Sequence, residues 1–152
     1  MNWAVQLITA FIGSLGFAIL FHVRKEFLFV ASLGGLFSWG IYLAGIRFGF
    51  SIFLSCFLAS AFSSFYAEML ARIKKAPAIM FFIPVVIPLV PGSNLYYTML
   101  GIGIKDMAMA RHNAILTLEY ALAIALGLSA MWAVLTIIRN VRGKQSDNNE
   151  AL

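Results

Sequence analysis

The segment PVVIPLVPGSN, Pro84–Asn94, places three prolines and a glycine inside a 29-residue stretch, Ala76–Ile104, that carries no charged side chain. A helix cannot pass through three prolines undisturbed, because each proline lacks an N–H and its ring clashes with the carbonyl four residues earlier. In lipid, an interrupted backbone is tolerated only where protein buries it or where it lines a polar cavity. The segment therefore predicts a broken membrane helix at a binding site, a pore or a tight helix contact.

The composition is typical of an integral membrane protein. Of the 152 residues, 62% are hydrophobic and 11% are charged, and the mean hydropathy is +0.91, far from the averages of soluble domains. Windows with little or no charge, near the ~20 residues that cross a bilayer, predict an all-α bundle of about five transmembrane helices. The expected spans are residues 2–21, 27–46, 48–67, 76–104 (broken) and 113–138, followed by a disordered cytoplasmic tail at residues 139–152.

Other classes of protein are disfavoured by the residues present. The first window has no Lys or Arg before Arg24 and no convincing cleavage site, so we expect a retained span rather than a signal peptide. Cys56 is the only cysteine, which excludes an intrachain disulfide and a multi-cysteine metal site, and we expect no metal or other cofactor. Most basic residues lie at span ends, so no nucleic-acid partner is indicated. No HExxH motif or nucleophile–base arrangement points to an enzyme.

Lys and Arg are unevenly divided between the two sides of a five-span bundle. One side would hold eight and the other three: Arg24, Lys25, Arg72, Lys74, Lys75, Arg139, Arg142 and Lys144 against Arg47, Lys105 and Arg111. Because these residues accumulate on the cytoplasmic side, we expect the N-terminus outside and the C-terminus in the cytoplasm. A re-entrant fourth stretch would give seven against four, so five spans are favoured and the re-entrant loop stays open.

Small residues recur at every fourth position in two spans and predict flat helix faces. The two ladders are Ser51, Ser55, Ala59, Ser63 and Ala67 in the third span, and Thr117, Ala121, Ala125, Ser129 and Ala133 in the fifth. Helices in lipid associate through close backbone approach, so generic bundle packing explains each ladder. Together they offer more contact surface than five short spans need, which indicates association with another membrane subunit.

A second half-helix is expected to start at the break. Pro91 and Gly92 would end the first half, and Ser93 or Asn94 would cap a helix over Leu95–Ile104. The unpaired N–H groups and the helix dipole at such an end attract an anion such as a carboxylate, as in transporters with broken helices. The candidate substrate-binding residues are Pro91, Gly92, Ser93, Asn94, Tyr96 and Tyr97. A proline-kinked structural helix explains the same residues equally well.

Two acidic residues carry separate hypotheses. Glu119 lies within the fifth span, where an ionised carboxylate is costly unless it is paired or faces water. It is the candidate for proton coupling, and the alternatives are snorkelling or a pair with Arg111 or His112. Glu68 and Arg72 are four residues apart, which predicts a surface ion pair.

Three blocks have a recognisable order and spacing: GFAILFHV (Gly16–Val23), ASLGGLFSWGIY (Ala31–Tyr42) and PAIMFFIPVVIPLVPGSNLYYTML (Pro77–Leu100). With them the chain resembles the threonine/serine exporter family, in its short split-gene form, over nearly its whole length. The third block carries the most specific motif, IPLVPGSNLYYTM. His22-Val23-Arg24 departs from the more proline-rich or asparagine-containing turn of many relatives.

The resemblance implies a proton-coupled secondary transporter of the bacterial inner membrane. In split members a larger membrane subunit supplies the other transporter half and a cytoplasmic region, which makes that subunit the expected partner. The implied substrates are threonine and serine or succinate-like dicarboxylates, all of which bear a carboxylate that the break could hold. The alternative is a membrane scaffold that stabilises the larger partner without transporting.

Overall fold

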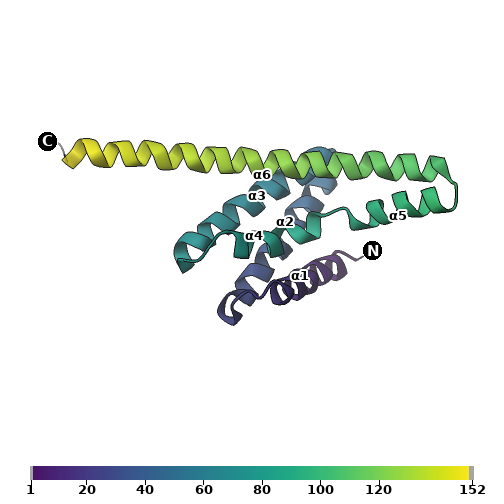
Figure 1. Ribbon diagram of the computed structural model, residues 1–152, viewed down its shortest axis with the longest axis horizontal. Helices are drawn as coiled ribbons and strands as arrows, with labels where there is room; N and C mark the ends of the chain where they lie inside the picture. The colour runs from purple at the N-terminus through teal and green to yellow at the C-terminus, as the bar shows by residue number, and fades with distance from the viewer. Residues whose placement is uncertain (1, 151–152) are drawn as a thin grey trace.

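The computed structural model describes residues 2–150, with side chains as far as Asn140, and this part of the chain is helical throughout apart from short connections (Figure 1). The helices are α1 (Trp3–Leu20), α2 (Lys25–Arg47), α3 (Ile52–Lys74), α4 (Ile79–Val86), the 3-10 helix η1 (Ile87–Leu89), α5 (Gly92–Gly103) and α6 (Met107–Glu150). Four of them, α1, α2, α3 and α6, are long and apolar enough to cross a membrane. Ile79–Leu89 and Gly92–Gly103 pass the same test as a pair bent by 56°. The all-α membrane bundle is therefore confirmed.

The broken pair runs from one end of the bundle to the other. Ser60 of α3 lies 3.4 Å from the carbonyl of Ala123 of α6, and further along both helices Glu68 and Trp132 line one pocket. α3 and α6 therefore run in the same direction, as Figure 1 also shows. The chain must return between these two parallel helices, and α4, η1 and α5 make this return, which favours a broken span over a re-entrant loop.

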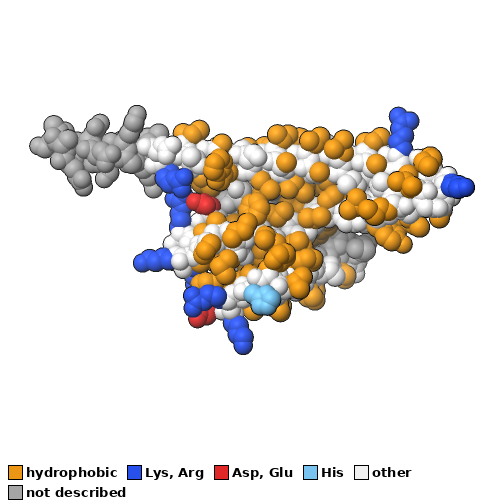
Figure 2. Space-filling model, in the orientation of Figure 1, with side chains coloured by type: hydrophobic (Ala, Val, Ile, Leu, Met, Phe, Trp, Pro, Cys, Tyr) orange, Lys and Arg blue, Asp and Glu red, His pale blue; other side chains and the backbone are white. Residues whose placement is uncertain are grey.

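Charged side chains gather at the two ends of the long axis, with a hydrophobic band between them (Figure 2). The cation of Arg47 lies 4.9 Å from the ring centroid of Trp3, which places the start of α1 at the α2–α3 end. Among the described side chains, the chain order puts six basic residues at one end and three at the other: Arg24, Lys25, Arg72, Lys74, Lys75 and Arg139 against Arg47, Lys105 and Arg111. Arg142 and Lys144 lie outside the described side chains.

Small residues bring α2 and α3 into close contact, as their spacing predicts. Ser55, Ala59, Ser63 and Ala67 of the α3 ladder are all buried. The hydroxyl of Ser63 donates to the carbonyl of Ala59 and lies 2.7 Å from the hydroxyl of Ser38 on α2. Because each hydroxyl finds a partner, these serines permit tight packing without leaving a polar atom unsatisfied in an apolar interior.

The ladder on α6 is largely exposed. Ala121, Ala125, Ser129 and Ala133 are exposed, and Thr117 is half-buried. α6 packs on α3 through a different pair, Ala123 and Gly127, both buried. Packing within this chain therefore explains the α3 ladder. The α6 ladder stays largely uncovered, although Thr117 and Ala121 border α5 and Ser129 borders a space next to α3 and α4.

The bounds of α6 differ from the expected 113–138. The helix begins at Met107 because Asp106 acts as its N-cap, with Oδ1 accepting from the N–H of Met109 at 3.0 Å. It continues to Glu150, and the apolar part ends at Asn140. The side chains of residues 141–152 lie outside the described part, so disorder of the tail at 139–152 stays a prediction.

Candidate functional site at the helix break

The helix interruption lies later than the first proline. Pro84 is accommodated inside α4 and is buried, as are Val85 and Leu89. The chain leaves helical geometry at Val90, whose φ and ψ are −65° and 125°. Because a residue before proline is disfavoured in the α region, Pro91 fixes this extended conformation. The expected break at Pro84–Asn94 is thus confirmed, and it narrows to Val90 and Pro91.

A neighbouring helix supplies a hydrogen bond to the backbone carbonyl that Pro88 leaves unpaired. In a regular helix the carbonyl of Pro84 would accept from residue 88, but proline has no N–H to donate. The hydroxyl of Ser14, a fully buried residue of α1, donates to this carbonyl instead. Gly35 of α2 allows this approach, since a Cβ there would stand 2.1 Å from the Ser14 hydroxyl oxygen. The kink before the break is therefore a built structural feature.

The second half-helix starts earlier than expected and without a side-chain cap. α5 begins at Gly92, with Pro91 as its N-cap, so the prediction that Ser93 or Asn94 caps a helix from Leu95 is wrong. The N–H of Gly92 bonds to the carbonyl of Val90 at 2.8 Å, and the N–H of Leu95 to that of Pro91 at 3.1 Å. Pro91 already supplies an extended entrance to the helix, which leaves Ser93 and Asn94 free to lie in the first turn.

The first turn of α5 retains two backbone donors. Among the described residues, the N–H groups of Ser93 and Asn94 have no hydrogen-bond acceptor, and neither do their side chains. Their place at a helix N-terminus favours an anion. Ser93 is exposed and Asn94 half-buried.

The predicted residues lie on an open surface rather than in an enclosed pocket. Tyr96 and Tyr97 are exposed and contact each other edge to face, with ring centroids 5.4 Å apart. α5 makes its extensive contacts with α6 and lies apart from α1, α2 and α3 (Figure 1). The structure thus brings Pro91, Gly92, Ser93 and Asn94 together at the bend, and it leaves one side of them uncovered.

Two cavities flank the break. One of about 360 Å³ lies beside Pro88, between α1 and α2, and is lined by Gln6, Thr9, Ala10 and Trp39. The other, about 290 Å³ and almost wholly apolar, lies between α5 and α6. Neither is lined by a predicted substrate residue. Gln6 was not predicted, and the sequence offers no signal for it because its position beside Pro88 depends on how α1 packs.

Glu119 lies on α6 at the level of the break. Leu95 of α5 and Ala121 of α6 line the same cavity, which places the neighbouring Glu119 beside the first turn of α5 along the helix axis. Its side chain is half-buried and forms no hydrogen bond or ion pair within the described residues, including the alternatives Arg111 and His112. The position is compatible with proton coupling, which stays a prediction.

Comparison with known families decides the class of the protein. The family described as threonine/serine exporter, ThrE, matches residues 6–134, which is most of the chain and includes the whole break. The chain belongs to the threonine/serine exporter family. The resemblance to this family is confirmed, and the chain is a multi-pass membrane protein of a transporter family. No curated protein and no solved structure matches the chain.

Proposed function

We propose that this exporter chain is the small subunit of a two-component secondary exporter, and that the first turn of α5 holds the carboxylate of its substrate. The observation that carries the proposal is the pair of free backbone N–H groups at Ser93 and Asn94, located at the bend between the two half-helices. Threonine, serine and succinate-like dicarboxylates all offer the anion that such a helix end favours. Pro91, Gly92, Tyr96 and Tyr97 complete the proposed site.

The second component is a larger membrane subunit that covers the open side of the site. A carboxylate held only by exposed groups would remain in contact with water or lipid, so transport needs another wall. Tyr96 and Tyr97 of α5 are exposed, as are Ala121, Ala125, Ser129 and Ala133 of the α6 ladder, and α5 makes its extensive contacts with α6. Small residues at every fourth position suit close approach of a further helix.

The proposed mechanism is alternating access in the bacterial inner membrane, with the N-terminus outside. Val90 and Pro91 form the joint between the two half-helices, where no regular helical hydrogen bonds resist bending. Glu119, at the level of this joint, is the proposed proton carrier. Basic residues at the α1–α2 and α3–α4 connections support a cytoplasmic location for that end.

A scaffold without a substrate site is the second candidate. The hydrogen bond from Ser14 to the carbonyl of Pro84 favours it, because this bond shows that part of the break is structurally satisfied. A scaffold would need the bend for assembly only. The two functions predict different rates of efflux when polar groups of the first turn of α5 are removed.

Replacing Ser93 and Asn94 together with alanine keeps their backbone N–H groups but removes the side-chain hydroxyl and amide that would bond the carboxylate beside them, and so separates the two functions. We expect efflux of labelled threonine per assembled complex to fall roughly tenfold to a hundredfold, the range for losing hydrogen bonds to a charged group. Thr98→Val is the matched control, since the Thr98 hydroxyl already bonds to the carbonyl of Asn94 at 2.8 Å. Unchanged efflux per complex, with altered assembly, would support the scaffold instead.

A further inference from the structure

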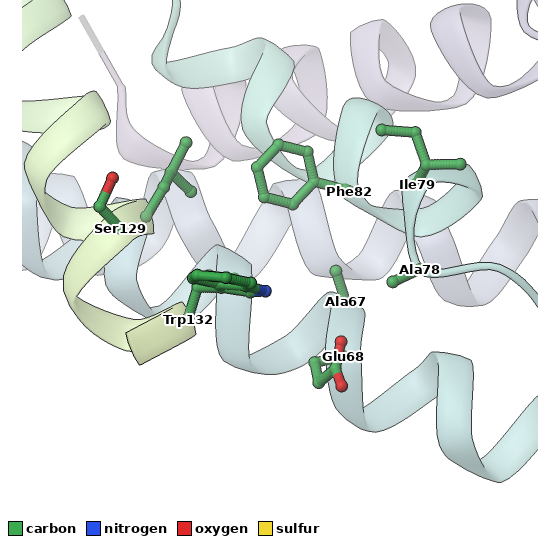
Figure 3. Close-up of a pocket in the computed structure, with 9 residues that line it drawn as sticks. Ala67, Glu68, Ala78, Ile79, Phe82, Ser129 and Trp132 are labelled. Atoms are coloured by element: carbon green, nitrogen blue, oxygen red, sulfur yellow. The ribbon is translucent and has the colours of Figure 1, made fainter. Parts of the chain in front are cut away.

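A pocket of about 350 Å³ lies between α3, α4 and α6, apart from the helix break (Figure 3). Glu68 and Ser64 line it from α3, Phe82 from α4, and Ser129 and Trp132 from α6. Its volume is at the small end of ligand pockets, which measure about 300–1,000 Å³. None of these residues belongs to the proposed carboxylate site, so the pocket needs its own explanation.

Glu68 is the charged residue of the pocket lining, and its carboxylate is only partly engaged. The predicted pair with Arg72 is confirmed, with Nη2 of Arg72 3.1 Å from Oε1 of Glu68. The side chain of Glu68 is 27% exposed, while that of Arg72 is 54% exposed and outside the lining. Within the described residues no donor bonds to Oε2 of Glu68, so one carboxylate oxygen remains available.

An aromatic face and two hydroxyls border the same space. Figure 3 shows Trp132 and Ser129 approaching from α6 opposite Ala67 and Glu68 of α3. The indole of Trp132 is exposed and stacks on no other ring in the described part of the chain. Indole faces attract cations, and serine hydroxyls can accept from them. A carboxylate, an indole and hydroxyls around a small space form the set of groups that recognises an ammonium ion.

We propose that this pocket binds the primary ammonium group of a small ligand. The carboxylate of Glu68 accepts its hydrogen bonds, Trp132 contributes its ring face, and Arg72 positions Glu68. We identify the ligand as the exported amino acid, bound by its amino group, and this identification rests on the proposed function. A carboxylate in the pocket repels a dicarboxylate, so the substrate class narrows to amino acids.

The location of the pocket fits a first contact for the substrate. It lies near the end of α3 at the connection rich in Lys and Arg, which is the end expected to face the cytoplasm. Phe82 of α4 lines the pocket, and the same helix continues through η1 to the break at Val90 and Pro91. One structural unit therefore connects the ammonium pocket with the carboxylate site, in the order that an exported substrate would meet them.

Fluorescence of Trp132 tests binding directly in the full-length chain. The tryptophans Trp3 and Trp39 are replaced with phenylalanine, and the protein is kept in detergent free of ethanolamine lipids. We expect threonine and threoninol, which carry the ammonium group, to change the emission with saturation. N-acetylthreonine and succinate, which lack it, should have no effect at the same concentration. An equal response to N-acetylthreonine would overturn the proposal.

Charge removal at Glu68 provides the matched comparison by calorimetry, which needs no fluorescent reporter. Glu68→Gln should weaken threonine binding at least about tenfold, or about 1.4 kcal/mol. Glu26→Gln should bind as the wild type does, because Glu26 pairs with Arg24 at 4.0 Å near the same end but lies outside the pocket. Retained affinity in Glu68→Gln would contradict the assignment.

Two further arms identify the source of the ammonium group and separate this inference from the transport proposal. In nanodiscs, binding of threonine is measured with and without phosphatidylethanolamine. If phosphatidylethanolamine occupies the site and threonine does not bind under either condition, the amino-acid assignment is overturned in favour of a lipid headgroup. Normal export by a complex carrying Glu68→Gln, with undiminished threonine binding, would overturn the pocket alone. Loss of binding in Glu68→Gln, together with normal export by Ser93 and Asn94 variants, would overturn the carboxylate site alone.

Discussion

Pro91→Ala should strongly reduce export while the protein still inserts into the membrane. Alanine removes the restriction that holds Val90 extended, so η1 and α5 can join into one straight helix. The N–H groups of Ser93 and Asn94 would then bond to carbonyls four residues earlier, and the proposed anion site would lose its donors. We expect efflux per assembled complex to fall at least about tenfold, as for other losses of hydrogen bonds to a charged ligand.

Pro77→Ala is the control for this experiment. Pro77 precedes α4, and its carbonyl accepts from the N–H of Met80 at 3.2 Å, a bond that alanine can also make. Export should therefore stay at the wild-type level in this variant. Wild-type export by Pro91→Ala would show that the break is a structural kink only.

Gly127→Val should separate α3 from α6 and destabilise the whole bundle. A Cβ at this position would lie 2.0 Å from the hydroxyl oxygen of Ser60 and 2.5 Å from the backbone carbonyl of Phe57. The hydroxyl can rotate away, but the carbonyl belongs to the helix and cannot. Because overpacking a close contact costs about 1–3 kcal/mol, we expect a loss of at least about 2 kcal/mol in unfolding free energy.

The stability comparison is made by reversible unfolding in mixed micelles. Gly16→Val is the matched control, because a Cβ at Gly16 would meet no atom within 4 Å. The control should change stability by less than about 0.5 kcal/mol, as for other surface substitutions. Equal stability of the two variants would mean that α3 and α6 do not pack as closely as the geometry indicates.

The membrane class, the long apolar helices and the place of the break followed from local features of the sequence. Charge-free windows predicted the spans, and the prolines predicted the interruption. Both predictions succeed because hydropathy and proline sterics depend on residues that are close together in the chain. The predicted helix bounds were less accurate where a single residue at the helix N-terminus determines where the helix starts. Asp106 caps α6 and moves its start to Met107, whereas the expected cap at Ser93 or Asn94 is superseded by Pro91.

Features that depend on packing between helices could not be predicted. The spacing of small residues is the same in the two ladders, yet four of the five residues of the α3 ladder are buried and four of the five of the α6 ladder are exposed. Nothing local distinguishes them, because burial depends on which helix lies opposite. For the same reason Glu68 was predicted only as a member of a surface ion pair. Its place in a pocket with Trp132 depends on how α3, α4 and α6 pack together, which the sequence does not reveal.

Efflux of labelled threonine from cells that contain the proposed larger subunit, with and without this chain, tests the central claim most directly. The measurement is normalised to the amount of larger subunit in the membrane, so that a stabilising effect alone does not alter it. If this chain supplies the substrate's carboxylate site, normalised efflux requires the chain and is lost without it. Equal normalised efflux in the two strains would contradict its role as a transport subunit.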